Sequence, residues 1–207
     1  MIERMRAFGL TIASIVCLAA LFYACHLAPP HENKIYTIAL RASSDRLNLR
    51  IELVPHPAIR ESVLHMYVNG AVESFPLGEN LQQNLPAVAR AAFSEATVGT
   101  GDEPDRSKID ALLKVKLQSA DDSGGEFPSD DRTSTIVLEW KLLDLDGHVV
   151  WAETVKGQAT RVHGIPLQAE RRAQERFRAT VADVCKKSYE ALSSSSVIRE
   201  FVNSTRR

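Results

Sequence analysis

The sequence predicts an α+β fold, in which an antiparallel sheet of about five to six strands carries two main helices on one face, behind an N-terminal signal or anchor helix. Three observations predict this class. Apolar and polar residues alternate from Leu47 to Val54, as in a half-buried strand. Apolar residues at helical spacing mark 77–98 and 166–192 as amphipathic helices. Asp146-Gly147 lies between two β-prone runs and indicates a hairpin.

Length and charge narrow the class of protein. The 207 residues contain 25 Lys and Arg against 26 Asp and Glu, which gives a net charge of −1. A near-neutral surface does not gather phosphates, and the sequence contains no zinc-finger, leucine-zipper or RNA-binding motif, so we expect no nucleic-acid partner. A chain of this length can supply one domain with a hydrophobic core. We therefore expect one domain and an anchor.

The N-terminus has the pattern of an export signal. Arg4 and Arg6 precede eighteen uncharged residues, Ala7 to Ala24, and a charged region followed by an apolar one is typical of such signals. The apolar run is slightly long for a secretory signal and slightly short for the roughly 20 residues of a membrane span. A cleaved lipoprotein signal, an uncleaved single-pass anchor and plain secretion all fit this length. Each of them places residues 26–207 outside the cytoplasm.

Cys25 is the candidate lipidation site. The residues before it, Leu21-Phe22-Tyr23-Ala24, resemble the lipobox of bacterial lipoproteins, in which the cysteine thiol is acylated before cleavage. The alternative is an inner-membrane anchor in which Cys25 lies beside Tyr23 at the lipid–water interface. If Cys25 is acylated, Cys17 lies in the discarded segment and Cys185 is the remaining cysteine of the domain. We expect Cys185 to be a buried helix residue.

These patterns divide the chain into three parts. Residues 1–24 are predicted to be the signal peptide or membrane anchor. Residues 25–33, which include Pro29 and Pro30, are predicted to be a short tether. Residues 34–207 are predicted to form the periplasmic α+β domain.

The first half of the domain is predicted to contain extended segments and one helix. Residues 34–41 and 47–54 are extended, and Asn69-Gly70 indicates a hairpin between residues 62 and 75. The first helix is predicted over Leu77–Val98, and its apolar stripe consists of Leu81, Leu85, Val88, Ala92 and Ala96. Pro86 either kinks this helix or lies in its first turn behind an Asn84 cap, where a missing N–H costs little.

The second half is predicted to contain three strands and a long helix. Residues 109–120 form a strand, residues 121–131 form a mobile acidic loop, and residues 133–161 form a hairpin. Trp140 and Trp151 lie on the two arms of this hairpin, where we expect them to be cross-strand partners.

The last predicted helix runs from Pro166 to Leu192, with serines 193–196 before a short amphipathic tail. Its buried stripe consists of Ala173, Phe177, Val181, Val184, Cys185 and Leu192. Its exposed side is expected to carry Arg171, Arg172, Arg176 and Arg178.

The sequence predicts no catalytic residue, cofactor site or metal site. The six histidines never occur at HxxxH or HExxH spacing. The Asp144–His148 stretch begins like a calcium loop, but its glycine is the fourth residue and not the sixth, so we interpret it as a hairpin turn. The acidic residues of 121–131 are expected to be solvated. We therefore expect a protein that is not an enzyme.

The order of these elements and the stretch "IVLEWKLLDLDGHVVWAETVKGQA" resemble small envelope lipoproteins of Gram-negative bacteria. Two groups are similar: the auxiliary lipoproteins of ABC-type lipid transport systems, and small lipoproteins like the α/β domain of penicillin-binding-protein activators. The resemblance carries over no functional residue. With His26 after Cys25, it implies a location on the periplasmic face of the outer membrane.

The resulting hypothesis is a membrane-anchored, non-enzymatic lipoprotein that acts as an accessory or scaffold in envelope assembly or transport. It would bind an envelope protein partner through an open sheet face or a strand edge. The alternative is a periplasmic binding module for a lipid or small amphiphile. That alternative requires an apolar cleft between the sheet and the helices.

Overall fold

The structure, a computed structural model, describes residues 34–40, 46–68, 70–100, 105–124, 131–161 and 169–205. The predicted signal or anchor segment, Cys25 and the tether lie outside these ranges. Residues 35–207 form one unit and residues 1–34 another. Within the described ranges, no helix has the length and apolar character that crossing a bilayer requires.

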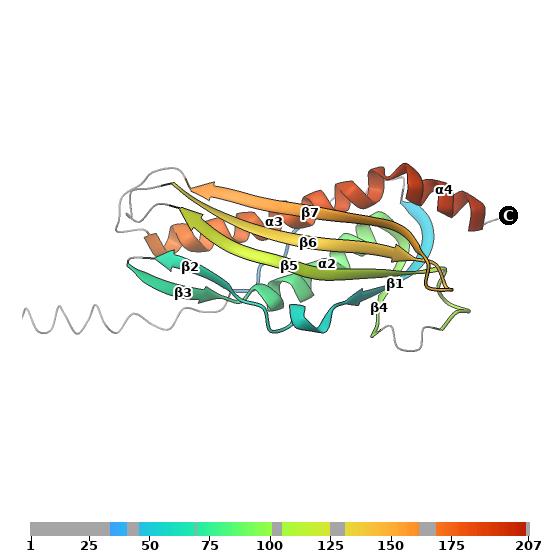
Figure 1. The fold of residues 1–207 in the computed structure, drawn as a ribbon, viewed down its shortest axis with the longest axis horizontal. Helices are drawn as coiled ribbons and strands as arrows, with labels where there is room; N and C mark the ends of the chain where they lie inside the picture. Colours follow the sequence, from blue (N-terminus) through green and yellow to red (C-terminus); the bar gives the residue numbers. More distant parts are fainter. Residues whose placement is uncertain are drawn as a thin grey trace, which may run out of the picture. The chain divides into compact units, whose positions relative to one another are not determined.

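Five strands form the main sheet, in the order β4-β1-β5-β6-β7 (Figure 1). Their bounds are β1 Leu47–Pro55, β4 Phe93–Val98, β5 Ala111–Gly124, β6 Arg132–Leu143 and β7 Val149–Arg161. The α+β class is confirmed, but the sheet is mixed rather than wholly antiparallel, because β1 runs parallel to both β4 and β5. The chain leaves β1 and returns through a helix before β4, and such a crossover connection produces parallel pairing.

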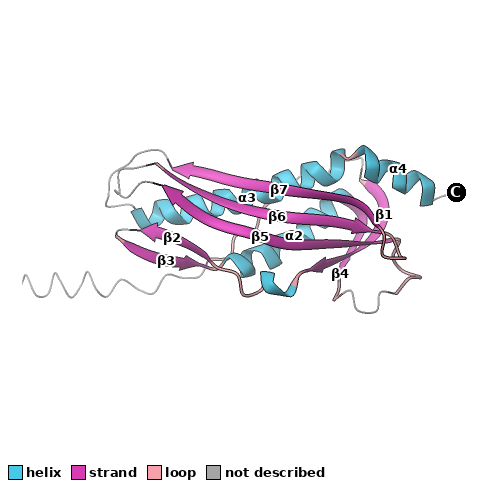
Figure 2. Cartoon of the chain, viewed as in Figure 1, coloured by secondary structure: helices cyan, strands magenta, loops and turns pink. Residues whose placement is uncertain are grey.

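The other elements are a small hairpin, a 3₁₀ turn and three helices (Figure 2). Their bounds are η1 Pro57–Ile59, β2 Leu64–Val68, β3 Ala71–Phe75, α2 Leu77–Ala92, α3 Ala169–Ser194 and α4 Ser196–Thr205. The β2–β3 hairpin turns at Gly70, whose φ of 86° is the left-handed conformation that glycine adopts readily. This hairpin, the long β6–β7 hairpin and the break before α4 confirm the predictions for these segments.

The core lies between the main sheet and the helices α2 and α3. Along β6, buried residues alternate with partly exposed ones, so one face of the strand meets the helices and the other does not. Trp140 is fully buried on this face, and its indole Nε1 donates a hydrogen bond to Ser188 Oγ on α3 at 2.9 Å. Gly157 on β7 allows the close approach of α3, since a Cβ there would lie 2.4 Å from the Val184 nitrogen.

The two tryptophans are diagonal neighbours rather than direct partners. The strand register places Trp140 opposite Glu153 and Trp151 opposite Leu142. Both indole rings are buried, at 0% and 8% exposure. They are therefore cross-strand neighbours on the two arms of the hairpin, as predicted, but in diagonal positions, since Trp151 lies two residues away from the position that faces Trp140.

The helix predicted over Leu77–Val98 is shorter than expected. It ends at Ala92, and Phe93–Val98 forms β4, parallel to β1. Pairing with β1 outweighs the helical periodicity here, as tertiary context often does for short segments. The helix begins at Leu77, as predicted, and Pro86 lies inside it, so the alternative start with Pro86 in the first turn is wrong. Asn84 is a buried mid-helix residue and not a cap.

Two predictions about charged side chains are wrong. Residues 121–124 of the predicted acidic loop belong to β5, while residues 125–130 lie outside the described part of the chain. Arg176, expected on the exposed side of the last helix, is only 5% exposed. It is buried because it forms an ion pair with Asp122, and a buried arginine requires such a partner.

An extended segment, Ile35–Leu40, is held on α2 by two asparagines. The backbone nitrogens of Tyr36 and Ile38 donate to Asn80 Oδ1 and Asn84 Oδ1, each at 2.8 Å. Asn84 Nδ2 in turn donates to the Tyr36 carbonyl oxygen at 2.6 Å. The two buried amides thus satisfy a backbone stretch that has no neighbouring strand among the described residues.

Candidate functional site

A groove of about 880 Å³ opens at the carboxyl ends of β1 and β4. It is lined by the end of β1, the η1 turn, α2, the residues after β4, and the strands β5 and β6. Its apolar wall residues are Val54, Pro55, Pro57, Pro86, Val98 and Val115. In open α/β sheets, ligands commonly bind outside the carboxyl ends of parallel strands.

The groove wall beside β1 is fixed by local hydrogen bonds. The backbone nitrogen of His56 donates to the Val115 carbonyl oxygen at 2.8 Å, which continues the β1–β5 pairing past the end of β1. His56 Nδ1 accepts a hydrogen bond from the backbone nitrogen of Ala58 at 3.2 Å. The imidazole therefore caps η1, whose first residue, Pro57, suits that position.

A close contact sets the distance between α2 and η1. A Cβ atom at Gly78 would lie 2.3 Å from the carbonyl oxygens of both Ile59 and Arg60. The Gly78 nitrogen also donates to the Ser62 carbonyl oxygen at 2.8 Å. Only glycine permits this approach, so the spacing between two walls of the groove depends on it.

Basic side chains line the part of the groove formed by the open sheet face. In the strand register, Lys114 lies opposite Val54 of β1 and Lys141 of β6, and Lys116 lies opposite Glu139 of β6. Lys141 Nζ lies 2.8 Å from Glu139 Oε1. The hydrogen bond from Lys141 lowers the pKa of Glu139, and the charges of Lys141 and Lys116 add to this effect.

The groove therefore combines apolar walls with an excess of positive charge. Arg60 adds a further cation at the η1 side. Apolar area with a few polar groups is typical of small-molecule sites. The arrangement suits an anion that also has an apolar part.

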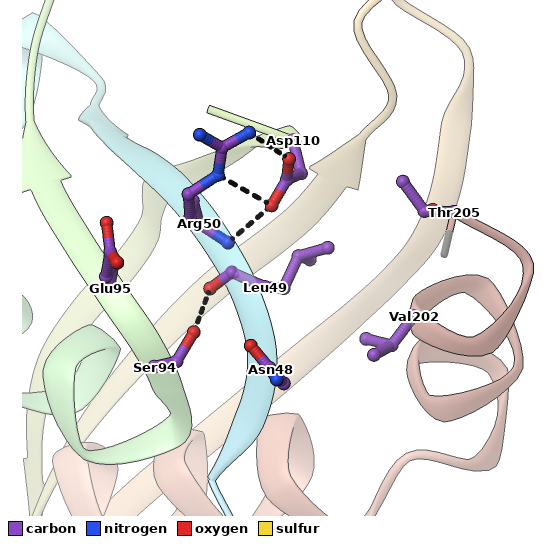
Figure 3. A pocket seen from close by; sticks show the side chains of 8 residues that line it. All are labelled: Asn48, Leu49, Arg50, Ser94, Glu95, Asp110, Val202 and Thr205. Atoms are coloured by element: carbon purple, nitrogen blue, oxygen red, sulfur yellow. Dashed lines mark hydrogen bonds and ion pairs between the residues drawn. The ribbon is translucent and has the colours of Figure 1, made fainter. Parts of the chain in front are cut away.

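A second, smaller hollow of about 260 Å³ lies near the start of β1 (Figure 3). In it Arg50 Nη2 and Nε lie 2.7 and 3.2 Å from the two carboxylate oxygens of Asp110, and the Arg50 backbone nitrogen donates to Oδ2 at 2.9 Å. On the other side of β1, Ser94 Oγ donates to the Leu49 carbonyl oxygen at 3.1 Å. These bonds fasten β1 to its two neighbours, so we assign this hollow a structural role.

The β6–β7 turn brings together Asp144, Asp146 and His148, with ligand atoms within 4.8 Å of one another. The Asp144 carboxylate accepts hydrogen bonds from the backbone nitrogens of Asp146 and His148 at 2.9 and 2.8 Å, and contacts His148 Nδ1 at 3.1 Å. The His148 N–H contributes most to the lowered pKa of Asp144. Because these bonds close the hairpin turn at Gly147, they account for the cluster without a metal.

Sequence reasoning missed a buried polar cluster around Asp122. Arg176 Nη2 lies 3.0 Å from Asp122 Oδ1, and Arg176 Nε donates to Ser134 Oγ at 2.8 Å. Ser134 Oγ donates in turn to Asp122 Oδ1 at 2.7 Å. The register of β5 shifts between Leu117 and Ser119. Such a bulge moves the buried face from odd to even residues, which hides Asp122 from an alternation analysis.

The one predicted modification site, Cys25, lies outside the described residues. Cys185 is fully buried on α3, as predicted. Burial raises the pKa of its thiol to about 12. A protonated, inaccessible thiol has a packing role and no nucleophilic one.

Comparison with known proteins gives solved structures of low similarity and no family. No protein-family model matches the chain, and no curated protein matches it. A Xanthomonas campestris protein of the DUF330 family is 16% identical, with a TM-score of 0.41, over 83% of this chain and 94% of its own. The PelC dodecamer from Paraburkholderia phytofirmans is 13% identical, with a TM-score of 0.41, over 74% and 92%.

A minor lipoprotein from Acinetobacter baumannii is 7% identical, with a TM-score of 0.43, over 70% of this chain and 92% of its own. At these identities and TM-scores, the likeness does not assign the chain to a family.

Proposed function

We propose that this protein is a membrane-tethered, non-enzymatic lipoprotein of the Gram-negative cell envelope, acting as an accessory or scaffold through contacts with an envelope protein. One observation carries the tethering. The extended segment is fastened to α2 at Tyr36 and Ile38, and only ten residues, 26–35, separate Cys25 from Tyr36. A segment of that length spans roughly 35 Å at most. An anchor at Cys25 would therefore hold the domain close to the bilayer surface.

The side chains of the groove favour binding over catalysis. Its titratable side chains are three lysines, an arginine, a capping histidine and one carboxylate that is paired with Lys141. Activation of a nucleophile requires a base within hydrogen-bond distance of it, itself oriented by a third group. The groove residues offer cations instead. The lipoprotein descriptions of structural neighbours are compatible with this proposal.

The first experiment is intact mass spectrometry of the membrane-extracted protein. We expect a mass that corresponds to residues 25–207 with acyl chains, and loss of this form in Cys25→Ser. Cys17→Ser is the matched control, because it makes the same cysteine-to-serine change within the apolar segment and should leave acylation of Cys25 intact. A full-length mass without lipid would instead support an uncleaved inner-membrane anchor.

A second experiment tests the protein partner. The face of the sheet away from the helices exposes Thr154 on β7, whereas Lys186 is exposed on the far side of α3. We expect a photoreactive residue at position 154 to give a discrete cross-linked species in intact cells, and one at position 186 to give none. Equal cross-linking from both positions, or from neither, would contradict a contact through the open sheet face.

The groove favours a second candidate function, a binding module for a small amphiphile. The sequence hypothesis required an apolar cleft between sheet and helices. The groove lies beyond the ends of β1 and β4 and extends onto the open sheet face rather than between sheet and helices, but it has apolar walls and α2 forms one of them. This function is independent of how the chain is anchored.

A further inference from the structure

We propose that the groove at the β1 and β4 ends binds a free single-chain amphiphile with an anionic headgroup, such as a carboxylate. The headgroup would lie at Lys114 and Lys116, and the chain would lie against Pro86 and Val98. This inference rests on the second candidate function and specifies its ligand class. It does not depend on acylation of Cys25.

The size and lining of the groove suit such a ligand. Its volume of about 880 Å³ falls within the range of roughly 300–1,000 Å³ that is typical of small-molecule sites. Val98 is 54% exposed although it is a large apolar residue, and it lies in the same groove as Pro86 of α2. An alkyl chain placed there would remove apolar surface from water on both partners.

The arrangement of charge selects an anion. Lys114 and Lys116 are two residues apart on β5, so both side chains project from the same open face. Glu139 is paired with Lys141, and neither Lys114 nor Lys116 forms an ion pair within the described part of the chain. An anionic head at this position would meet two cations, whereas a neutral head would form only the weaker hydrogen bonds of an uncharged acceptor and a cationic head would be repelled.

The walls of the groove are rigid, which favours binding. Pro55 and Pro57 restrict the backbone where β1 leads into η1, and Gly78 fixes the contact between η1 and α2. A preformed site loses little conformational entropy when it binds a ligand.

The test uses the full chain in phosphatidylcholine nanodiscs, with diazirine-bearing decanoate as the probe and diazirine-bearing decanol as the uncharged match. We expect decanoate to label peptides that contain Pro86 or Val98, and decanol to label them much less. The variant Lys114→Gln/Lys116→Gln should reduce labelling about tenfold. Its matched control is Lys156→Gln/Lys186→Gln, which removes two exposed lysines outside the groove and should label normally.

A second variant tests the site independently, in case the double lysine variant loses labelling because it misfolds. Val98→Asp changes a half-exposed residue at the end of a strand, and it should also reduce labelling while the cooperative thermal transition is retained. Three outcomes would each overturn the proposal. They are labelling by decanol equal to that by decanoate, full labelling of both groove variants, and labelling confined to peptides without Pro86 or Val98. If labelling by decanoate were lost in phosphatidylglycerol nanodiscs, the anionic lipid headgroups of the bilayer would be occupying the groove. That result would overturn the proposal that the ligand is a free amphiphile.

This experiment is independent of the mass measurement. An unlipidated chain that still binds decanoate would refute the proposed lipoprotein but support the proposed ligand of the groove. A lipidated chain that does not bind decanoate would support the lipoprotein but refute the ligand.

Discussion

Arg176 and Asp122 bury two opposite charges at the centre of four elements. Their side chains are 3% and 1% exposed. Ser134 on β6 links the two, and the backbone nitrogen of Tyr67 on β2 donates to Asp122 Oδ2 at 3.3 Å. Water cannot compensate either charge at this depth, so each depends on the other. The cluster fixes where β2, β5, β6 and α3 meet.

We expect Asp122→Ala to lower the free energy of unfolding by about 3–5 kcal/mol, because it leaves the Arg176 guanidinium buried without its carboxylate. Urea denaturation followed by circular dichroism measures this change. The control is Glu175→Ala, which removes the partner of Arg171 from an exposed pair and should cost at most about 1 kcal/mol. Similar losses in both variants would show that Asp122 is not the structural counter-charge.

The buried thiol of Cys185 predicts a pH dependence. Its pKa is raised from 9.0 to about 12 in the folded protein, so the folded state favours the protonated thiol. The stability that this provides is fully present below pH 9.0 and is lost as the pH rises from there towards about 12. We expect the free energy of unfolding to fall more steeply in this range for the natural sequence than for Cys185→Ala.

Parallel denaturation series at several alkaline pH values measure the Cys185 effect. Thiol-labelling reagent should also react with Cys185 only after unfolding. Identical pH slopes in the natural sequence and in Cys185→Ala would contradict the assignment to this thiol.

At the scale of elements, α2 does more than cover the sheet. Its buried asparagines hold the extended segment Ile35–Leu40, and its glycine contacts η1. The same helix thus connects the entry of the chain into the domain with a wall of the groove. Its end at Ala92 releases Phe93–Val98 to pair with β1.

Replacing Asn84 with leucine should detach this extended segment. The change removes the bonds to the Ile38 nitrogen and the Tyr36 carbonyl, and we expect a loss of about 1–3 kcal/mol in the free energy of unfolding. Hydrogen exchange at the amide of Ile38 should accelerate. Gln83→Leu, an exposed neighbour on the same helix, is the control. Unchanged exchange at Ile38 in Asn84→Leu would disprove the role of this amide.

For the molecule as a whole, residues 35–207 form a unit that begins shortly after the proposed lipid site. Its main sheet combines β1, β4 and β5 in parallel with the antiparallel strands β6 and β7. Partners distant in sequence, such as Arg50 and Asp110, join this sheet across 60 residues. Cooperative folding of the whole unit follows from such long-range contacts.

A protease site inserted between Pro30 and His31 should therefore release the domain from membranes without changing its fold. We expect the released fragment and the uncleaved protein to show the same urea midpoint, because the insertion precedes the first contacts with α2. Fractionation and denaturation curves provide the measurement. A shifted midpoint would indicate that residues before 31 stabilise the domain.

Local periodicity determined most elements of this protein. The alternation in β1 and β6, the Asp-Gly turn and the apolar stripe of α3 each depend on residues a few positions apart, so the sequence alone could predict them. The burial of Cys185 followed from the same stripe. The predicted export signal and the predicted lipidation site at Cys25 likewise rest on patterns of adjacent residues.

Only the tertiary structure decided how these elements combine. Parallel pairing of β1 with β4 converted the end of a predicted helix into a strand, and the bulge near Gln118 turned Asp122 towards Arg176. Val98 and Lys114 line the same groove only because β4 and β5 flank β1. Each of these outcomes depends on contacts between distant segments, whose energies a local pattern does not contain.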